Sequence, residues 1–201
     1  MSSEPIAGYA LLSDCRSAAL VSASGSVDWL CFPRFDSPSV FGRLLGAEAG
    51  SWSIRPAAEH TSTRRYLGPT MVLETVYTAP GGSLTVTEAL ALGDGNRGHG
   101  LGAAAPGALL RQLSCTEGEV AVDVVLSPRP EYGLITPLLH ETAGGILARG
   151  GADVLAFSTT APFEISGHAA HARLTLRAGE VLGFALHHRN SWQEEPSFWT
   201  Q

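Results

Sequence analysis

The chain has 201 residues, of which 44% are hydrophobic and 16% charged, and its formal net charge at pH 7 is −6. This composition is that of a folded globular protein and argues against a disordered chain. An acidic balance without any basic run argues against nucleic acid and anionic membrane surfaces as partners, because both require a basic face.

No stretch approaches the roughly 20 apolar residues that a membrane-spanning helix needs. The first ten residues, MSSEPIAGYA, show neither the basic nor the apolar region of a secretory signal. Cys15, Cys31 and Cys115 are odd in number and widely spaced, which favours reduced thiols over disulfides or a metal site. We therefore expect a cytoplasmic protein without a metal or another cofactor.

Short β-strand patterns, which are apolar and β-branched runs bounded by Gly and Pro, dominate the chain. The clearest hairpin joins two such runs across the turn 79–82 (APGG), and another joins 18–21 to 27–32 across a Gly-containing loop. In chain order, strands are expected at 18–21, 27–32, 50–54, 70–78, 83–90, 109–115, 120–126, 145–149, 153–159, 172–176 and 181–187.

These strands, with 23 Gly and 12 Pro to turn the chain, predict an all-β fold. The expected architecture is a large two-sheet antiparallel β-sandwich, similar to a supersandwich, with few short helices. Only residues 40–45 and the residues after Ser191 look briefly helical. The Gly/Ala-rich stretch 94–107 predicts a flexible connection and not a phosphate-binding loop, because it does not lead from a strand into a helix.

We expect one sandwich domain over residues 1–190, followed at 191–201 by a tail of different character. The twelve residues from Asn190 to Gln201 are aromatic and acidic, and they include Trp192, Phe198 and Trp199. Large apolar side chains at a terminus indicate a segment that packs against something further on.

Arg34 is the centre of the most polar segment, where it lies between Asp28 and Asp36. An Arg between two carboxylates can form bidentate pairs that pin a loop, or can hold a sugar or a carboxylate ligand. The structural interpretation is an Asx-type turn beginning at Asp36 and crosslinked by Arg34. A role in contacting a ligand or a neighbouring domain is the functional one.

A second polar segment, PRPEYG at 128–133, follows the strand expected at 120–126. Two prolines make it rigid, and Arg129 and Tyr132 can stack or can cover one end of the sandwich. Asp14 and Arg16 form a third polar segment, for which we favour a structural role. The sequence predicts no catalytic residue and no metal ligand, because no nucleophile, metal or phosphate motif is recognisable.

The opening segment 5–21 (PIAGYALLSDCRSAALV) and the following 25–46 (GSVDWLCFPRFDSPSVFGRLLG) resemble the N-terminal domain of bacterial glycoside hydrolase family 15 proteins. These are the glucoamylase-like and trehalase-like enzymes. Further matching motifs follow in the same order along nearly the whole chain: RRYLGPTMVLETVY, SLTVTEAL, PRPEYG and LTLRAGEVLGFALHH. The chain departs from the family at Glu88, where Asp is usual, and at Pro130-Glu131, where Phe-Asp is commoner.

The resemblance implies a β-sandwich that a linker joins to an (α/α)6 barrel, in which two glutamates perform an inverting hydrolysis of α-glucosidic bonds. The barrel and both glutamates lie outside the matched segments, so no catalytic residue carries over. Because the sandwich loops of such enzymes face the barrel, Arg34 and Asp36 are candidates for the domain interface or its sugar cleft. The sequence does not decide whether the chain forms a homo-oligomer through the surface that would face the barrel.

The sequence and the resemblance leave three alternative functions. The first is a non-catalytic accessory sandwich of a trehalase-like or glucoamylase-like enzyme. The second is a free-standing carbohydrate-binding module that uses Trp29, Trp52 or the tail aromatics as sugar platforms. The third is a small hydrolase with a carboxylate pair from the 28–36 loop and Glu131.

Overall fold

A computed structural model describes residues 4–95, 97–193 and 198–199 of the chain. In this part of the chain the structure consists of strands with two short 3-10 helices, η1 (Ile6–Gly8) and η2 (Gly98–Gly100). The strands are β1 (Ala10–Ser13), β2 (Ala18–Val21), β3 (Ser26–Cys31), β4 (Ser39–Phe41), β5 (Ser51–Pro56), β6 (Thr61–Tyr66), β7 (Leu73–Ala79), β8 (Gly82–Leu90), β9 (Ala108–Ser127), β10 (Leu138–Thr142), β11 (Gly145–Gly150), β12 (Asp153–Ser158), β13 (Glu164–Ser166), β14 (Ala169–Arg177) and β15 (Val181–Asn190).

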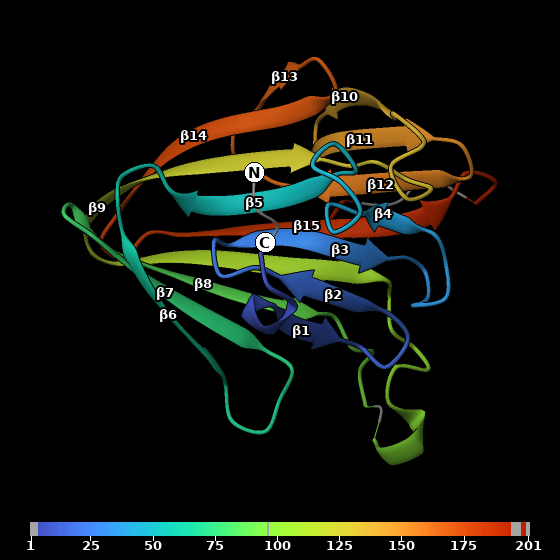
Figure 1. The fold of residues 1–201 in the computed structure, drawn as a ribbon, viewed down its shortest axis with the longest axis horizontal. Helices are drawn as coiled ribbons and strands as arrows, with labels where there is room; N and C mark the ends of the chain where they lie inside the picture. The colour runs from blue at the N-terminus through green and yellow to red at the C-terminus, as the bar shows by residue number, and fades with distance from the viewer. Residues whose placement is uncertain (1–3, 96, 194–197, 200–201) are drawn as a thin grey trace.

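The strands form two antiparallel layers that share the long strand β9 (Figure 1). The first sheet has the order β1-β2-β3-β5-β9-β14-β13, with β4 paired to β3. The second sheet has the order β6-β7-β8-β9-β15-β12-β11-β10. The predicted all-β, two-sheet antiparallel sandwich is confirmed.

Strand β9 passes from one sheet to the other, so the two strands expected at 109–115 and 120–126 are halves of one element. The N-terminal half pairs with β8 and β15, and the C-terminal half pairs with β5 and β14. The chain bends at Gly118, which has a left-handed φ of 66° and lies against the carbonyl of Gly81. Only glycine meets both demands at this corner.

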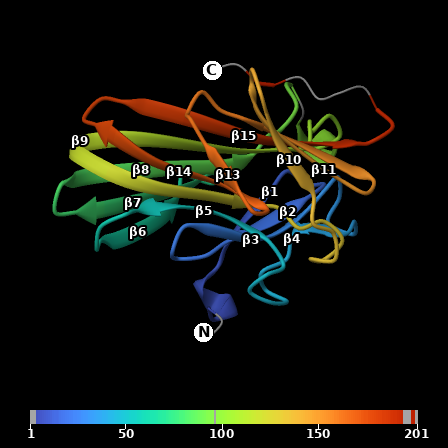
Figure 2. The ribbon, with the colours of Figure 1, turned by 90° about the horizontal axis from the view of Figure 1, so that it is seen from above.

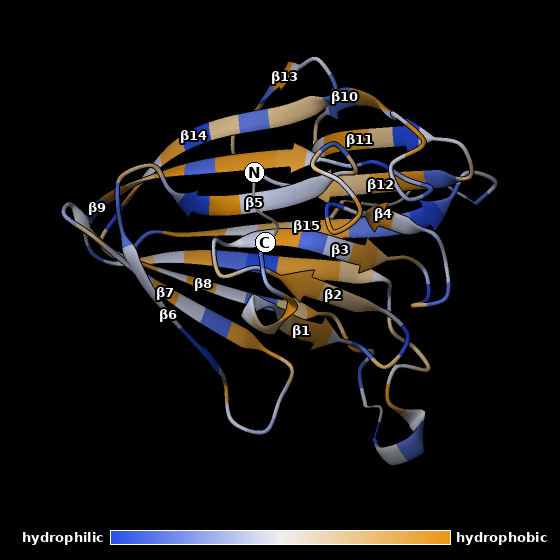
Figure 3. Cartoon of the chain, in the orientation of Figure 1, coloured by the Kyte–Doolittle hydropathy of each residue, from blue (hydrophilic) through white to orange (hydrophobic). Residues whose placement is uncertain are grey.

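The core lies between the two layers and is centred on Trp52 of the first sheet. The Trp52 ring meets the edges of Phe157 and Phe184 from the second sheet at centroid distances of 5.3 and 6.3 Å. Along the longer strands apolar and polar residues alternate, with the apolar ones turned inward (Figure 3). Trp52 is completely buried, so its assignment as a sugar platform is wrong.

A buried arginine that is paired with a glutamate of its own sheet ties the two layers together. From β9 in the second sheet, Arg111 donates through Nε to Glu88 at 2.6 Å and through its terminal nitrogens to the carbonyls of Trp52 and Gly25, each at 2.8 Å. Its guanidinium also lies 4.8 Å from the centre of the Trp52 ring. Burial raises the pKa of Glu88, and the charge of Arg111 acts in the opposite direction.

Two expectations of short helices are not met. Residues 40–45 were expected to be helical, but Ser39–Phe41 form strand β4 on β3, and turns follow. Pairing with β3 buries Val40 and Phe41 completely, which a single exposed helical turn cannot do. The helical expectation after Ser191 meets a turn at 191–193, and its remainder lies partly outside the described residues.

The two termini, which overlap in Figure 1, lie on opposite faces of the molecule in Figure 2. The N-terminal segment lies on the outer side of the first sheet. The final described residues, Phe198 and Trp199, lie against the second sheet, where Phe198 packs on Leu147, Val154 and Ala156. Among the described residues, no helix has the length and apolar character that crossing a membrane would require.

Candidate functional site

Three loops adjoin β4 at one end of the first sheet and carry four of the sequence-predicted site residues, Arg34, Asp36, Arg129 and Tyr132. They are residues 32–38 between β3 and β4, residues 42–50 between β4 and β5, and residues 128–137 after β9. The amides of Arg129 and Tyr132 donate to the carbonyls of Val40 and Ser39 at 2.9 and 3.3 Å, and Gly133 lies against Ala49. We call this region the loop end.

Asp28 is a buried acceptor at the base of the loop end and is not an open ligand-binding group. Its carboxylate accepts hydrogen bonds from the hydroxyls of Tyr9 at 2.8 Å and Ser26 at 2.5 Å, and it lies 3.9 Å from Nε of Arg43. Burial and the adjacent Asp28 raise the pKa of Tyr9 far above its ordinary value. Asp28 therefore anchors the N-terminal segment to β3.

Arg34 pairs with Asp36, whereas Asp28 is bound by the hydroxyls of Tyr9 and Ser26. The pair is bidentate, with Nε–Oδ1 at 2.9 Å and a terminal nitrogen to Oδ2 at 3.1 Å. Both side chains are 60% exposed. The amide of Ser37 donates to the carbonyl of Arg34, so ion pair and turn together shape the β3–β4 loop.

Arg129 and Tyr132 have different surroundings within the same turn. The Arg129 guanidinium donates to the carbonyls of Pro128 at 2.7 Å and His168 at 3.0 Å, and burial lowers its pKa. Tyr132 is half-exposed and its ring lies 6.3 Å from that of Trp29. The aromatic partner of Tyr132 among the described residues is Trp29, and the Arg129 guanidinium is directed to backbone carbonyls instead.

The three carboxylates of the hydrolase hypothesis have separate surroundings. Asp28 is buried with Tyr9 and Ser26, whereas Asp36 lies on an exposed loop with Arg34. Glu131 lies in a left-handed turn with a φ of 55°. The buried and exposed aspartates do not share one partner, and the geometry offers no assembled acid–base pair at the loop end.

The sequence analysis did not identify the exposed apolar side chains at the loop end. Phe35, Leu45, Leu134 and Leu138 are 66%, 63%, 85% and 72% exposed. Phe35, Leu45 and Leu134 lie in turns, outside any alternating strand pattern, and this was the available signal; Leu138 begins strand β10. Single exposed apolar residues are ordinary, whereas an apolar patch built from several of them is a common property of surfaces that contact other proteins.

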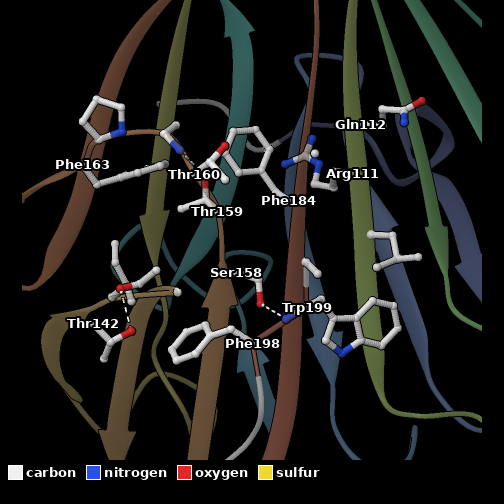
Figure 4. A pocket seen from close by; sticks show the side chains of 18 of the residues that line it. Arg111, Gln112, Thr142, Ser158, Thr159, Thr160, Phe163, Phe184, Phe198 and Trp199 are labelled. Carbon is white, nitrogen blue, oxygen red and sulfur yellow. Dashed lines mark hydrogen bonds between the residues drawn. The ribbon is translucent and has the colours of Figure 1, made fainter. Parts of the chain in front are cut away.

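A pocket of about 1020 Å³ lies elsewhere, on the outer side of the second sheet (Figure 4). Strands β8, β9, β15 and β12, the β10–β11 turn, the 159–163 loop and the tail residues Phe198 and Trp199 line it. None of Asp28, Arg34, Asp36, Arg129 and Tyr132 lines this pocket, whereas Phe198 and Trp199 of the aromatic tail do. Within the described ranges, no group of three or more His, Cys, Asp and Glu side chains is placed to hold a metal ion.

Comparison with known proteins gives a consistent result. Residues 1–182 match the family described as "Trehalase-like, N-terminal". The chain is 33% identical over 96% of its length to a trehalase of Mycolicibacterium smegmatis, and it spans 31% of that protein. A trehalase of Mycobacterium tuberculosis is also 33% identical, and "Trehalase 1" of Sulfolobus acidocaldarius is 34% identical over 61% of the chain. The chain thus spans about a third or less of these relatives.

Proposed function

Because this chain belongs to the trehalase-like N-terminal family, we propose that it forms a non-catalytic accessory domain of a glycoside hydrolase of family 15. The parent enzyme hydrolyses an α-glucosidic bond, and its proposed substrate is trehalose, because the relatives are trehalases. The sandwich supports the folding and docking of a catalytic (α/α)6 barrel formed by a different part of the enzyme.

The observation that carries this proposal is the group of exposed apolar side chains at the loop end. Phe35, Leu45 and Leu134 lie in the three loops, and Leu138 is the first residue of β10, directly after the third loop. Backbone hydrogen bonds join that third loop to β4. A rigid surface of apolar groups with the ionic pair Arg34–Asp36 beside it has the composition of an interface between domains. The proposal assigns this surface to the barrel.

Activity of the purified chain tests the non-catalytic part of the proposal. The 201-residue chain is incubated with trehalose, maltose and starch, and glucose release is measured. The proposal expects no turnover, because the buried carboxylates Asp28 and Glu88 are held by partners inside the fold. Clear turnover by the pure chain would refute an accessory role.

A chimaera tests the docking part. The chain replaces the aligned third of the Mycolicibacterium smegmatis trehalase, and the trehalase activity and thermal midpoint of the product are measured. Changing both Leu134 and Leu138 to Asp in an active chimaera is expected to lower its thermal midpoint. Val181→Asp is the matched control, since Val181 is also exposed but is the first residue of β15, where it pairs with Ser114 of β9. Equal effects of the two changes would contradict docking at the loop end.

A further inference from the structure

The pocket on the second sheet is hollow because small residues line up across its strands. The register places Gly145, Ser158 and Ala185 side by side on β11, β12 and β15, and continues through Leu110 to Ala89. Side chains of alternate residues in a strand point to the same face, so this row forms one floor. Large residues at these positions would fill the space.

The walls of the pocket come from segments far apart in the sequence. The β10–β11 turn with Thr142 stands on one side, the loop with Thr159 and Thr160 on another, and the tail with Trp199 closes a third (Figure 4). The Trp199 amide donates to Ser158 Oγ at 2.9 Å, which fixes the tail to the floor. Gly144 lies so close to the Phe198 ring that any side chain there would displace it.

The chemistry of the lining selects a neutral ligand. Arg111 borders the pocket, but all three of its guanidinium nitrogens are engaged, with Glu88 and the carbonyls of Trp52 and Gly25. It is therefore not available to hold an anion. Glu141 is the remaining charged residue of the lining, and it is exposed.

Uncharged polar groups and aromatic rings make up the rest of the recognition surface. Thr87 and Thr160 present hydroxyls and Gln112 presents an amide, while the Phe198 and Trp199 rings offer apolar faces. Hydroxyl and amide groups beside an aromatic face match a sugar ring, which has polar edges and apolar C–H faces. The volume, about 1020 Å³, exceeds what one hexose requires and suits an oligosaccharide.

We propose that this pocket is a sugar-binding site, in which Trp199 stacks on a neutral oligosaccharide while Gln112 and Thr87 hydrogen-bond its hydroxyls. The preference for an α-glucoside rests on the proposed function, whereas the recognition of a sugar rests on the pocket itself. The site differs from the platforms considered from sequence, since Trp52 is buried in the core and Trp29 packs near Tyr132. The tail aromatics are the part of that hypothesis retained here.

Calorimetric titration of the 201-residue chain tests the proposal with trehalose, maltotriose and cellobiose as probes. We expect at least one α-glucoside to bind with a dissociation constant of about 1 mM or tighter, in the range where calorimetry still resolves binding. Trp199→Ala and Gln112→Ala are each expected to weaken binding about tenfold. Trp192→Ala is the matched control, because Trp192 is 73% exposed and does not line the pocket.

Ala185→Leu adds bulk to the floor and is expected to abolish binding while circular dichroism and the thermal midpoint report that the sandwich persists. Gln112 is exposed, so Gln112→Ala is expected to leave the strand pairing unchanged. Weaker binding by this variant therefore reports on the pocket and not on folding. No heat with any of the three sugars, or equal losses with Trp199→Ala and Trp192→Ala, would overturn the proposal. Either result leaves the loop-end docking test unaffected, because the chimaera variants lie outside the pocket.

Discussion

Arg111 and Arg34 each hold a carboxylate through Nε, at 2.6 and 2.9 Å, but in opposite surroundings. The side chains of Arg111 and Glu88 are 0% and 1% exposed, whereas those of Arg34 and Asp36 are both 60% exposed. Arg111 also binds the carbonyls of Trp52 and Gly25, while Arg34 pairs with a residue only two positions further along the chain. Two ion pairs of similar length therefore have different consequences, because burial and additional partners decide what an ion pair contributes.

Replacing Arg111 by Met is expected to give the largest effect. The change leaves the Glu88 carboxylate buried without its partner and frees the carbonyls of Trp52 and Gly25. Breaking a buried pair on one side costs about 3–5 kcal/mol, which is a large share of the stability of a domain. Urea unfolding followed by tryptophan fluorescence measures this loss; a loss below about 1 kcal/mol would show that the layers do not depend on the pair.

Removing both charges of the buried pair tests whether the cost of Arg111→Met comes from leaving Glu88 without a partner. In the double variant Glu88→Leu with Arg111→Met, no charge remains buried, so the double change is expected to cost less than Arg111→Met alone. Buried pairs replaced by apolar residues of similar volume are often nearly neutral. A double-mutant cycle from the same unfolding curves gives the coupling between the two side chains. Additive losses would contradict a direct interaction.

His187 tests burial without a charged partner and is expected to give a smaller, pH-dependent effect. Its ring is 3% exposed, Nε2 contacts the carbonyl of Pro106 at 2.9 Å, and Nδ1 has no partner among the described residues. Burial, with Arg189 adding to it, lowers the pKa of His187. The unfolded chain then binds a proton that the folded chain does not, so stability falls as the pH drops below about 6.5.

The slope attributable to this group is at most about 1.4 kcal/mol per pH unit. His187→Gln removes the titrating group while a side-chain amide can still donate to Pro106. Its stability is therefore expected to change less between pH 7.5 and pH 5 than that of the original chain. Denaturant unfolding at both pH values measures the difference, and identical pH dependence in the two proteins would refute the assignment.

The strands of the fold and the partners of Arg111 and Arg34 differ in how far the sequence predicts them. Alternating runs such as β8 define one buried face, so the longer strands and the sandwich class followed from pattern, whereas β1, β4, β6, β10 and β13 were not predicted. Strand β6, whose residues TSTRRY lack alternation and are mostly exposed, exists because β7 pairs with it, and no local signal announces it. The partners of Arg111 and Arg34 depend on which strands face each other, which the sequence does not state.

The same limit applies to the candidate sites. The segments 28–36 and 128–133, which the sequence offers as candidates, lie near each other in the structure, where the Trp29 ring is 6.3 Å from that of Tyr132; their function stays a prediction. The pocket on the second sheet was not anticipated, because its floor consists of small residues from three strands that are adjacent only after pairing. Small residues give no chemical signal of their own in a sequence.

Arg34→Ala is expected to give the smallest effect on the isolated chain. Exposed ion pairs contribute about 0–1 kcal/mol, and here the turn keeps its backbone hydrogen bond from Ser37. The loss is expected to shrink further in high salt, because solvent and ions screen an exposed pair. Unfolding measurements at low and high salt check this. Within the chimaera proposed above, however, the same change is expected to lower the thermal midpoint by more than in the isolated chain, since docking would bury the pair. An equal loss of thermal midpoint in the isolated chain and in the chimaera would mean that Arg34 lies outside the interface and stays exposed to solvent in both proteins.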